Sequence, residues 1–438
     1  MKTDLLADRH IGIQEADLPA MLEKIGVKSL DELINKTIPS KIRLKEPLAL
    51  AAPMTEREFA EHIAGLASLN KIYTSYIGMG WYDTITPAVI QRNVFENPAW
   101  YTSYTPYQTE VSQGRLEALL NFQTVISDLT AMPLANCSLL DEATAAAEAA
   151  TMMYGLRSRD QQKKGTNVLF VDESIFPQNL AVIQTRVIPQ GMKIQVGNYK
   201  ELEFTPEIFA CIIQYPNASG SVEDYREFVE KAHAANCKVA VDADILSLAL
   251  LLPPGEWGAD IVFGSTQRLG IPLFYGGPSA AYFATRDEYK RNMPGRIIGL
   301  SKDKYGKICY RMALQTREQH IKREKATSNI CTAQALLATM AGFYAVYHGQ
   351  EGIKNIAKRI HSIATWLNKA LARLGYVQHN EIFFDTLRFS LPDHVSAQKL
   401  RTIALSKEVN LCYYDNGDVG FSIDETTDLK DVNLLLSI

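Results

Sequence analysis

The chain contains 438 residues, 47% of them hydrophobic, with 45 basic and 49 acidic side chains and a formal net charge of −4. This length allows large buried cores and two or three domains, whereas the small net charge and the lack of a long basic run argue against a nucleic-acid partner. No apolar stretch reaches the roughly 20 residues that span a bilayer, and no signal-peptide core follows Met1. We therefore expect a cytoplasmic protein without a membrane segment.

The spacing of cysteine and histidine supports neither a disulfide framework nor a metal site. The six cysteines include no Cys-x-x-Cys pair, so we expect reduced and mostly buried thiols. The eight histidines show neither His-x-x-x-His nor Cys-x-x-His spacing, and we expect no bound metal. The cysteines are Cys137, Cys211, Cys237, Cys309, Cys331 and Cys412.

Residues 1–70 are predicted to form an N-terminal helical arm. The region 4–36 suggests two short helices, the second with Ser29 as its N-cap, followed by an extended connector that contains prolines. Thr55 and Glu58 have the spacing of a capping box, which predicts that a further helix begins there.

Residues 71–330 are predicted to form a large α/β domain. A glycine turn at 76–80 leads into a polar loop, Ser112 is expected to be the N-cap of a long helix, and an alanine-rich helix covers about 143–157. Beyond it, short apolar runs alternate with helical or loop segments, which predicts a mostly parallel sheet covered on both faces. The strand candidates are 168–171, 193–196, 209–214, 239–242, 261–263 and 280–284.

Residues 331–438 are predicted to form two linking helices and a small C-terminal α/β domain. The helices cover about 332–348 and 353–374, and a strand–helix–strand–strand unit follows, in which Asn416-Gly417 marks a hairpin. The last ten residues have the pattern of an amphipathic helix without a stop signal. We therefore expect this domain to be truncated from a longer chain.

Three features, in sequence order, match a fold that binds pyridoxal phosphate (PLP). The helix start between Ser138 and Thr144 could face an anion, although such a cluster alone is more often a simple cap. Asp242 ends a buried strand, the place of the carboxylate that pairs with a pyridinium nitrogen, and a glycine-rich loop at 276–278 follows. Together they predict a PLP-dependent transferase-like domain of the aminotransferase type (fold type I).

Gln267 stands where such a fold carries the lysine that forms a Schiff base with PLP. A glutamine amide cannot form an imine, so we expect no covalent cofactor and no catalytic residue in this chain. A competent enzyme using Lys302 or Lys304 is an alternative. The absence of lysine between Lys238 and Lys290 argues strongly against it.

Phe176 lies roughly where related folds place a histidine over the pyridine ring. An aromatic ring could stack there, but it offers no proton chemistry. A buried core phenylalanine is the favoured interpretation, because phenylalanine is so often buried.

The segment 101–110 is too polar and aromatic for a strand core and too long for a tight turn. Loops of this kind commonly line sites or interfaces. Packing on the surface is an equally good interpretation from the sequence alone.

Four stretches together resemble the P-protein family of the glycine cleavage system, glycine dehydrogenase (decarboxylating), over nearly the whole chain. The stretch 317–334 is the most specific of them, whereas the helix-start motif would mean little alone. The stretches are 9–12, 104–114, 138–148 and 317–334.

The resemblance implies an enzyme of two homologous halves, fused or separate, in which the second half holds the PLP lysine. The whole enzyme would decarboxylate glycine on PLP and transfer the aminomethyl group to the lipoyl arm of a carrier, the H-protein. This chain resembles the first half, in which a glutamine such as Gln267 is normal. The expected partners are the C-terminal half or subunit 2, the H-protein and glycine, in a dimer.

The resemblance also implies that the cofactor motif is vestigial in this half. PLP would be bound by the other half, and Asp242, Thr144 and Ser138 would be remnants of a cofactor site. Ala143 stands where related chains often have glycine, which makes close approach of a phosphate doubtful.

A half without the lysine could still complete the active site of its partner. We expect the loop 104–114 and the turn 76–80 to face that site across the interface. The alternative is a non-catalytic interaction module with a PLP-type fold, and the two differ in whether turnover depends on the loop. The expected interface residues are Tyr104, Thr105, Tyr107, Gln108, Glu110, Ser112, Gly78 and Gly80.

Overall fold

The computed structural model describes residues 12–102, 105–317, 319–326, 330 and 333–438. The chain separates into two compact units, Met1–Tyr73 and Thr74–Ile438, each of which is described by itself. Among the helices of the described ranges, none combines the length and the apolar character needed to cross a membrane. The division of the second unit at residue 330 stays a prediction.

Local capping interactions define the helices of the first unit. The Ser29 hydroxyl accepts a hydrogen bond from the Glu32 backbone N–H at 3.1 Å, and Thr55 and Glu58 form the predicted capping box. Of the described residues of this unit, Val27 alone is a buried hydrophobic. The helices are α2 (Leu18–Ile25), α3 (Leu30–Thr37) and α4 (Glu56–Ala67).

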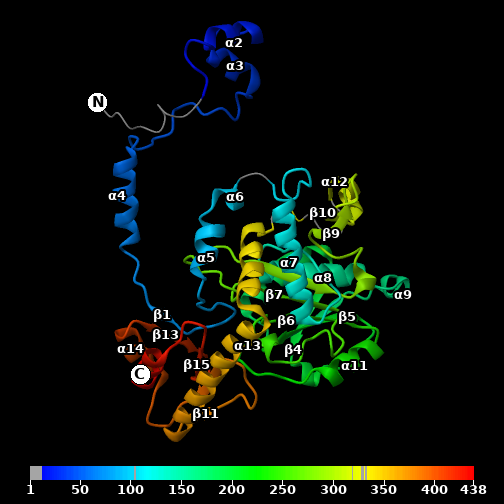
Figure 1. Ribbon diagram of the computed structural model, residues 1–438, viewed down its shortest axis with the longest axis vertical. Coiled ribbons are helices and arrows are strands. Elements are labelled where there is room, and N and C mark those ends of the chain that lie inside the picture. Colours follow the sequence, from blue (N-terminus) through cyan, green and yellow to red (C-terminus); the bar gives the residue numbers. More distant parts are fainter. Residues whose placement is uncertain (1–11, 103–104, 318, 327–329, 331–332) are drawn as a thin grey trace. The chain divides into compact units, whose positions relative to one another are not determined.

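A seven-stranded sheet forms the centre of the second unit (Figure 1). Neighbouring strands from β7 to β4 in the order below run parallel, whereas β8 is antiparallel to β7 and β2 is antiparallel to β8. All six predicted strands are confirmed; the two-residue β2 was not predicted. In spatial order the strands are β2 (Leu134–Ala135), β8 (Ala281–Thr285), β7 (Ile261–Ser265), β6 (Lys238–Ala243), β5 (Ile208–Tyr215), β3 (Val168–Asp172) and β4 (Lys193–Gly197).

Helices cover both faces of this sheet, as predicted. Successive side chains of a strand point to opposite faces. Ala210 and Ile212 of β5 therefore pack in one apolar core with α8 and α10, and Cys211 and Ile213 pack in another with α7, α11 and α13. The helices are α7 (Gln113–Thr130), α8 (Glu142–Gly155), α10 (Pro177–Val187), α11 (Arg226–Ala234) and α13 (Ala335–Arg373).

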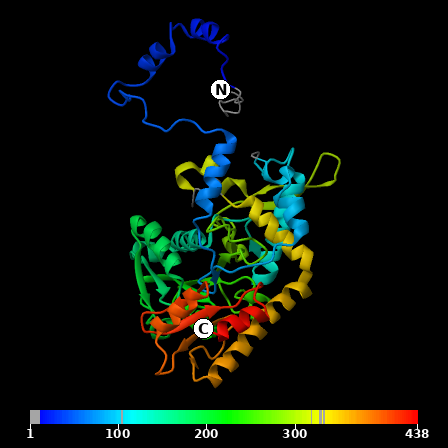
Figure 2. The same cartoon turned by 90° about the vertical axis from the view of Figure 1, so that its left-hand side faces the viewer.

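The two predicted linking helices form one element, α13, with a break inside it. Gly349 has φ 62° and ψ −180°, which is not helical, so the chain changes direction between its two segments. Figure 2 shows α13 in yellow to orange, running from the large sheet toward the small one. The prediction of two helices is therefore confirmed, because the helical conformation is interrupted at Gly349.

A four-stranded sheet beside the second segment of α13 has its own apolar core. The predicted hairpin at Asn416-Gly417 joins β14 and β15, and Gly417 has φ 90°. α15 ends at Leu436, two residues before the last residue. The elements are β11 (Val377–Gln378), β12 (Thr386–Ser390), β15 (Val419–Ser422), β14 (Cys412–Tyr413), α14 (Ala397–Ser406) and α15 (Leu429–Leu436).

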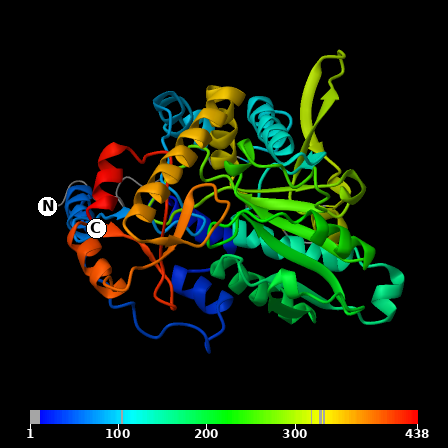
Figure 3. The ribbon, with the colours of Figure 1, turned by 90° about the horizontal axis from the view of Figure 1, so that it is seen from below.

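Short elements complete the second unit. β1 pairs in parallel with β13, and the hairpin of β9 and β10 extends away from the large sheet (yellow-green, Figure 3). These elements are β1 (Thr74–Ser75), α5 (Ala88–Ile90), η1 (Gln91–Phe95), α6 (Pro98–Tyr101), α9 (Arg159–Lys163), η2 (Ile188–Gln190), η3 (Tyr199–Glu201), η4 (Ser247–Ala249), η5 (Asp287–Tyr289), β9 (Ile297–Lys302), β10 (Ile308–Ala313), η6 (Gln315–Arg317), α12 (Gln319–Lys322), η7 (Arg323–Lys325) and β13 (Val409–Asn410).

The described cysteines are mostly buried. Cys137, Cys211, Cys237 and Cys412 are free and buried, and Cys309 is free and partly buried. These five confirm the predicted burial, and the sixth cysteine lies outside the described residues.

Gly264 in β7 offers a test of the large sheet. A Cβ there would lie 2.3 Å from the Ala243 carbonyl oxygen, so Gly264→Ala should lower the free energy of unfolding by roughly 3 kcal/mol. Urea denaturation measures this change. Gly155→Ala is the control, since its Cβ would meet nothing within 4 Å. Equal urea midpoints for the two variants would contradict the packing described here.

Candidate functional site

Asp242 is buried at the carboxyl end of β6 and is paired with Glu142, an acid that is half-buried. The side-chain amide of Asn179 donates to its Oδ2 at 2.7 Å, and the carboxyl group of Glu142, the first residue of α8, is hydrogen-bonded to it. Burial and the charge of Glu142 raise the pKa of Asp242 well above its usual range. Burial likewise raises the pKa of Glu142, to about 7. Two adjacent buried carboxyls are stable when they share a proton.

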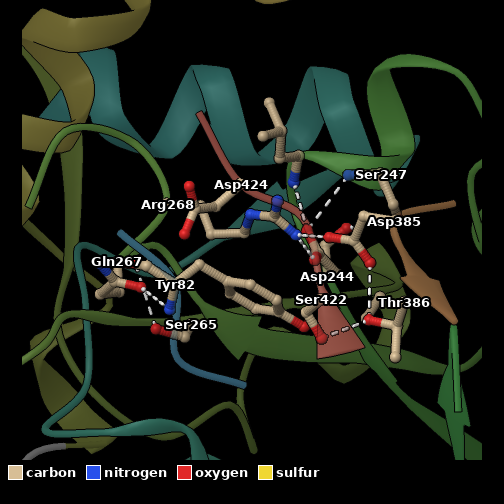
Figure 4. A network of polar contacts seen from close by, with 12 residues as sticks. Tyr82, Asp244, Ser247, Ser265, Gln267, Arg268, Asp385, Thr386, Ser422 and Asp424 are labelled. Atoms are coloured by element: carbon tan, nitrogen blue, oxygen red, sulfur yellow. Dashed lines mark hydrogen bonds and ion pairs between the residues drawn. The ribbon is translucent and has the colours of Figure 1, made fainter. Parts of the chain in front are cut away.

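Gln267 is buried, and its whole amide is used in structural hydrogen bonds (Figure 4). Its Nε2 donates to the carbonyl oxygens of Tyr82 at 2.7 Å and Ile271 at 2.8 Å. Its Oε1 accepts from the Tyr82 backbone N–H at 3.2 Å. The side chain therefore ties the loop after β7 to the segment after the glycine turn, and it supplies no nucleophile.

Arg268, the next residue, forms a buried ionic cluster that was not predicted from the sequence. Its Nη1 donates to the carboxylates of Asp244, just beyond β6, and of Asp385, just before β12. Its guanidinium carbon lies 3.9 Å from the centre of the Tyr82 ring (Figure 4). The only signal in the sequence was that Arg268 is the single charged residue between Ile261 and Pro278. The cluster connects the large sheet to the small one.

A cavity of about 460 Å³ opens beside these acids. Trp81, Glu142, Ala143 and Asn179 line it, together with the loop 276–279. Asp242 is not among the lining residues, and 1% of its surface is exposed. Glu142 and Asn179 therefore stand between Asp242 and the cavity.

The predicted anion-binding residues are placed apart from the cavity wall. The backbone N–H of Thr144 donates to Oδ1 of Asp141 at 2.7 Å, so an acidic cap already occupies the start of α8. Ser138 is fully buried, with φ 146°, and its Oγ has no hydrogen-bond partner among the described residues. Neither residue lines the cavity.

These residues do not fit a bound PLP. The pyridine nitrogen would need access to an ionised Asp242, and Glu142 and Asn179 cover that carboxyl. The phosphate would meet the acidic side chains of Asp141 and Glu142 at the helix start, where negative charges repel it. Gln267 provides no amine.

The glycine turn packs against this pocket and against the small sheet. A Cβ on Gly80 would lie 3.0 Å from the Phe176 ring and 3.1 Å from Oε2 of Glu142. A Cβ on Gly78 would lie 2.0 Å from Oγ of Ser422, so neither position accepts a side chain. Phe176 is buried, which confirms its interpretation as a core residue.

The loop before α7 is held at its base. The Ser112 hydroxyl donates to the Thr105 carbonyl oxygen at 3.3 Å and accepts from Arg115 at 2.9 Å. Ser112 is at the predicted N-cap, but its side chain does not cap the helix. The Arg296 guanidinium lies 4.3 Å from the centre of the Tyr107 ring. Gln108 and Glu110 are exposed, and Tyr104 lies outside the described residues.

The Arg268 cluster predicts a large loss of stability when the cation is removed. Arg268→Met would leave the buried Asp385 and the partly buried Asp244 without their counter-ion, and we expect the free energy of unfolding to fall by roughly 3 kcal/mol. Urea denaturation at neutral pH checks this expectation. Arg226→Met, which removes an exposed pair with Asp224, should leave the midpoint nearly unchanged. A similar small effect at both sites would show that the buried cluster is not stabilising.

Comparison with known proteins extends over the whole chain. A glycine dehydrogenase (decarboxylating) from Bacteroides thetaiotaomicron is 80% identical over 438 residues, which is 100% of this chain and 46% of that protein. One from Flavobacterium johnsoniae is 56% identical with the same coverage. The chain thus spans about half the length of these curated relatives, and it matches their N-terminal half.

Solved structures confirm the predicted fold. The crystal structure of a glycine decarboxylase (P-protein) of the glycine cleavage system, in inhibitor-bound form, matches with a TM-score of 0.86 and 30% identity, covering 98% of each chain. An alanine–glyoxylate aminotransferase from Nostoc shares the fold at 15% identity, with a TM-score of 0.56 over 84% of this chain and 94% of that one. The sequence model of the glycine cleavage system P-protein matches residues 8–438. The chain therefore belongs to the glycine cleavage system P-protein family.

Proposed function

We propose that this chain is the N-terminal half of a glycine dehydrogenase (decarboxylating). The complete enzyme would decarboxylate glycine on PLP and pass the aminomethyl group to the lipoyl arm of the H-protein. The high identity to relatives of twice this length supports the proposal. Its partner would be the C-terminal half, in a dimeric enzyme of the cytoplasm.

This half would not catalyse the reaction itself, and one observation carries that view. At the position where the fold would carry its nucleophile, both N–H groups and the oxygen of the Gln267 amide are hydrogen-bonded to backbone groups. PLP and glycine would therefore be held by the other half. Residues 1–70, 71–330 and 331–438 would serve as arm, large domain and small domain.

The contribution of this half would be to complete the partner's active site. The Thr105–Ser112 loop is suited to this role, because hydrogen bonds at Ser112 fix its base while Gln108 and Glu110 are exposed. Loops held by a rigid scaffold commonly carry such functional groups. The turn at Gly78 and Gly80, which was also expected to face the partner's site, packs against this half's own pocket and small sheet, so the proposal relies on the loop.

Gln108→Ala in the complete enzyme tests this proposal. We expect kcat for glycine decarboxylation, with lipoylated carrier present, to fall about tenfold or more if the amide touches the reacting groups. Tyr107→Ala should lower kcat in the same direction, because the loop would lose its contact with Arg296.

Gln398→Ala, an exposed glutamine on α14, is the matched control and should leave kcat unchanged. Size-exclusion chromatography establishes that each variant still assembles. Unaltered kinetics of an assembled Gln108 variant would instead support a purely structural half.

A further inference from the structure

The carboxyl group of Glu142 lies on the open side of Asp242. It is hydrogen-bonded to Asp242, to Asn179 and to the backbone of Ser265, and its Oε2 is next to Gly80. Because Glu142 lines the cavity and Asp242 does not, a molecule in the cavity would meet Glu142 first. That is the place where the ring nitrogen of PLP would have to approach Asp242.

The charges around this pair require that it keep a proton. Asp244, just beyond β6, adds a further negative charge, and the nearby Tyr282 hydroxyl is already bound to the carbonyl oxygen of Ala243 at 2.6 Å. Arg268 is the nearby cation, and it is already bound to Asp244 and Asp385. The pair is thus compensated by a shared proton rather than by a cation.

We propose that Glu142 takes the place of the cofactor's ring nitrogen in this half, so that its pairing with Asp242 closes the pocket against PLP even without a covalent bond. This goes beyond the function proposed above, which concerns only the missing lysine. Asp141 reinforces the closure, because its carboxylate occupies the Thr144 N–H at the helix start that a phosphate would need.

Binding of pyridoxine 5′-phosphate to the 438-residue chain tests the proposal. This probe has no aldehyde, so it forms no imine with surface lysines, and Trp81 in the cavity wall reports on binding by fluorescence. We expect no saturable binding to the wild type at millimolar probe. Glu142→Ala should bind at least tenfold more tightly, because Asp242 becomes accessible.

Glu173→Ala, which removes an exposed acid beyond β3, is the control and should behave like the wild type. Saturable binding by the wild type would overturn the proposal. Equal absence of binding in the wild type and in folded Glu142→Ala would overturn it as well, because Glu142 would then not be the barrier.

A second measurement stands even if Glu142→Ala fails to fold. The pKa of Glu142 is raised from 4.5 to about 7 in the folded chain, so its protonated form contributes stability below pH 4.5, which is lost as the pH rises through about 7. The urea midpoint of the wild type should therefore fall between pH 5 and pH 8. In Glu142→Gln, whose side chain cannot ionise, the urea midpoint should fall less over this pH range. An equal fall in the wild type and in Glu142→Gln would contradict the shared proton.

Discussion

The arrangement of this half depends on the need to compensate the carboxylates buried at the end of β6. A charge removed from water is tolerated only with a partner or a proton. Asp242 is hydrogen-bonded to the Asn179 amide and to the carboxyl of Glu142, and Asp244 is paired with the Arg268 guanidinium. These partners come from α10, α8 and the loop after β7, so the positions of all three elements are set by two residues of one strand end.

The same loop contributes a second set of buried polar contacts. The Gln267 amide holds Tyr82 through its hydrogen bonds, and Tyr82 in turn provides the ring against which Arg268 lies. Two neighbouring polar side chains of the loop are therefore engaged with the protein itself.

Local sequence signals predicted the fold well, because strands, caps and turns depend on neighbouring residues. The six strands, the Ser29 cap and the Asn416-Gly417 hairpin follow from periodicity and turn chemistry. The acid pair and the Arg268 cluster could not be predicted in this way. Arg268 and Asp385 are 117 positions apart, and charged residues in a sequence are ordinarily assigned to the surface. The position of Asp242 was read correctly, whereas its partners required the tertiary structure.

The connection that Arg268 makes between the two sheets has a mechanical consequence. Moving the small sheet away from the large one would separate a buried guanidinium from Asp385, while Asp244 holds it on the other side. An opened form that costs a few kcal/mol would be populated on the order of one per cent or less. Within residues 74–438, the two sheets should therefore keep their relative position, and the Arg268 cluster acts as a lock rather than as a hinge.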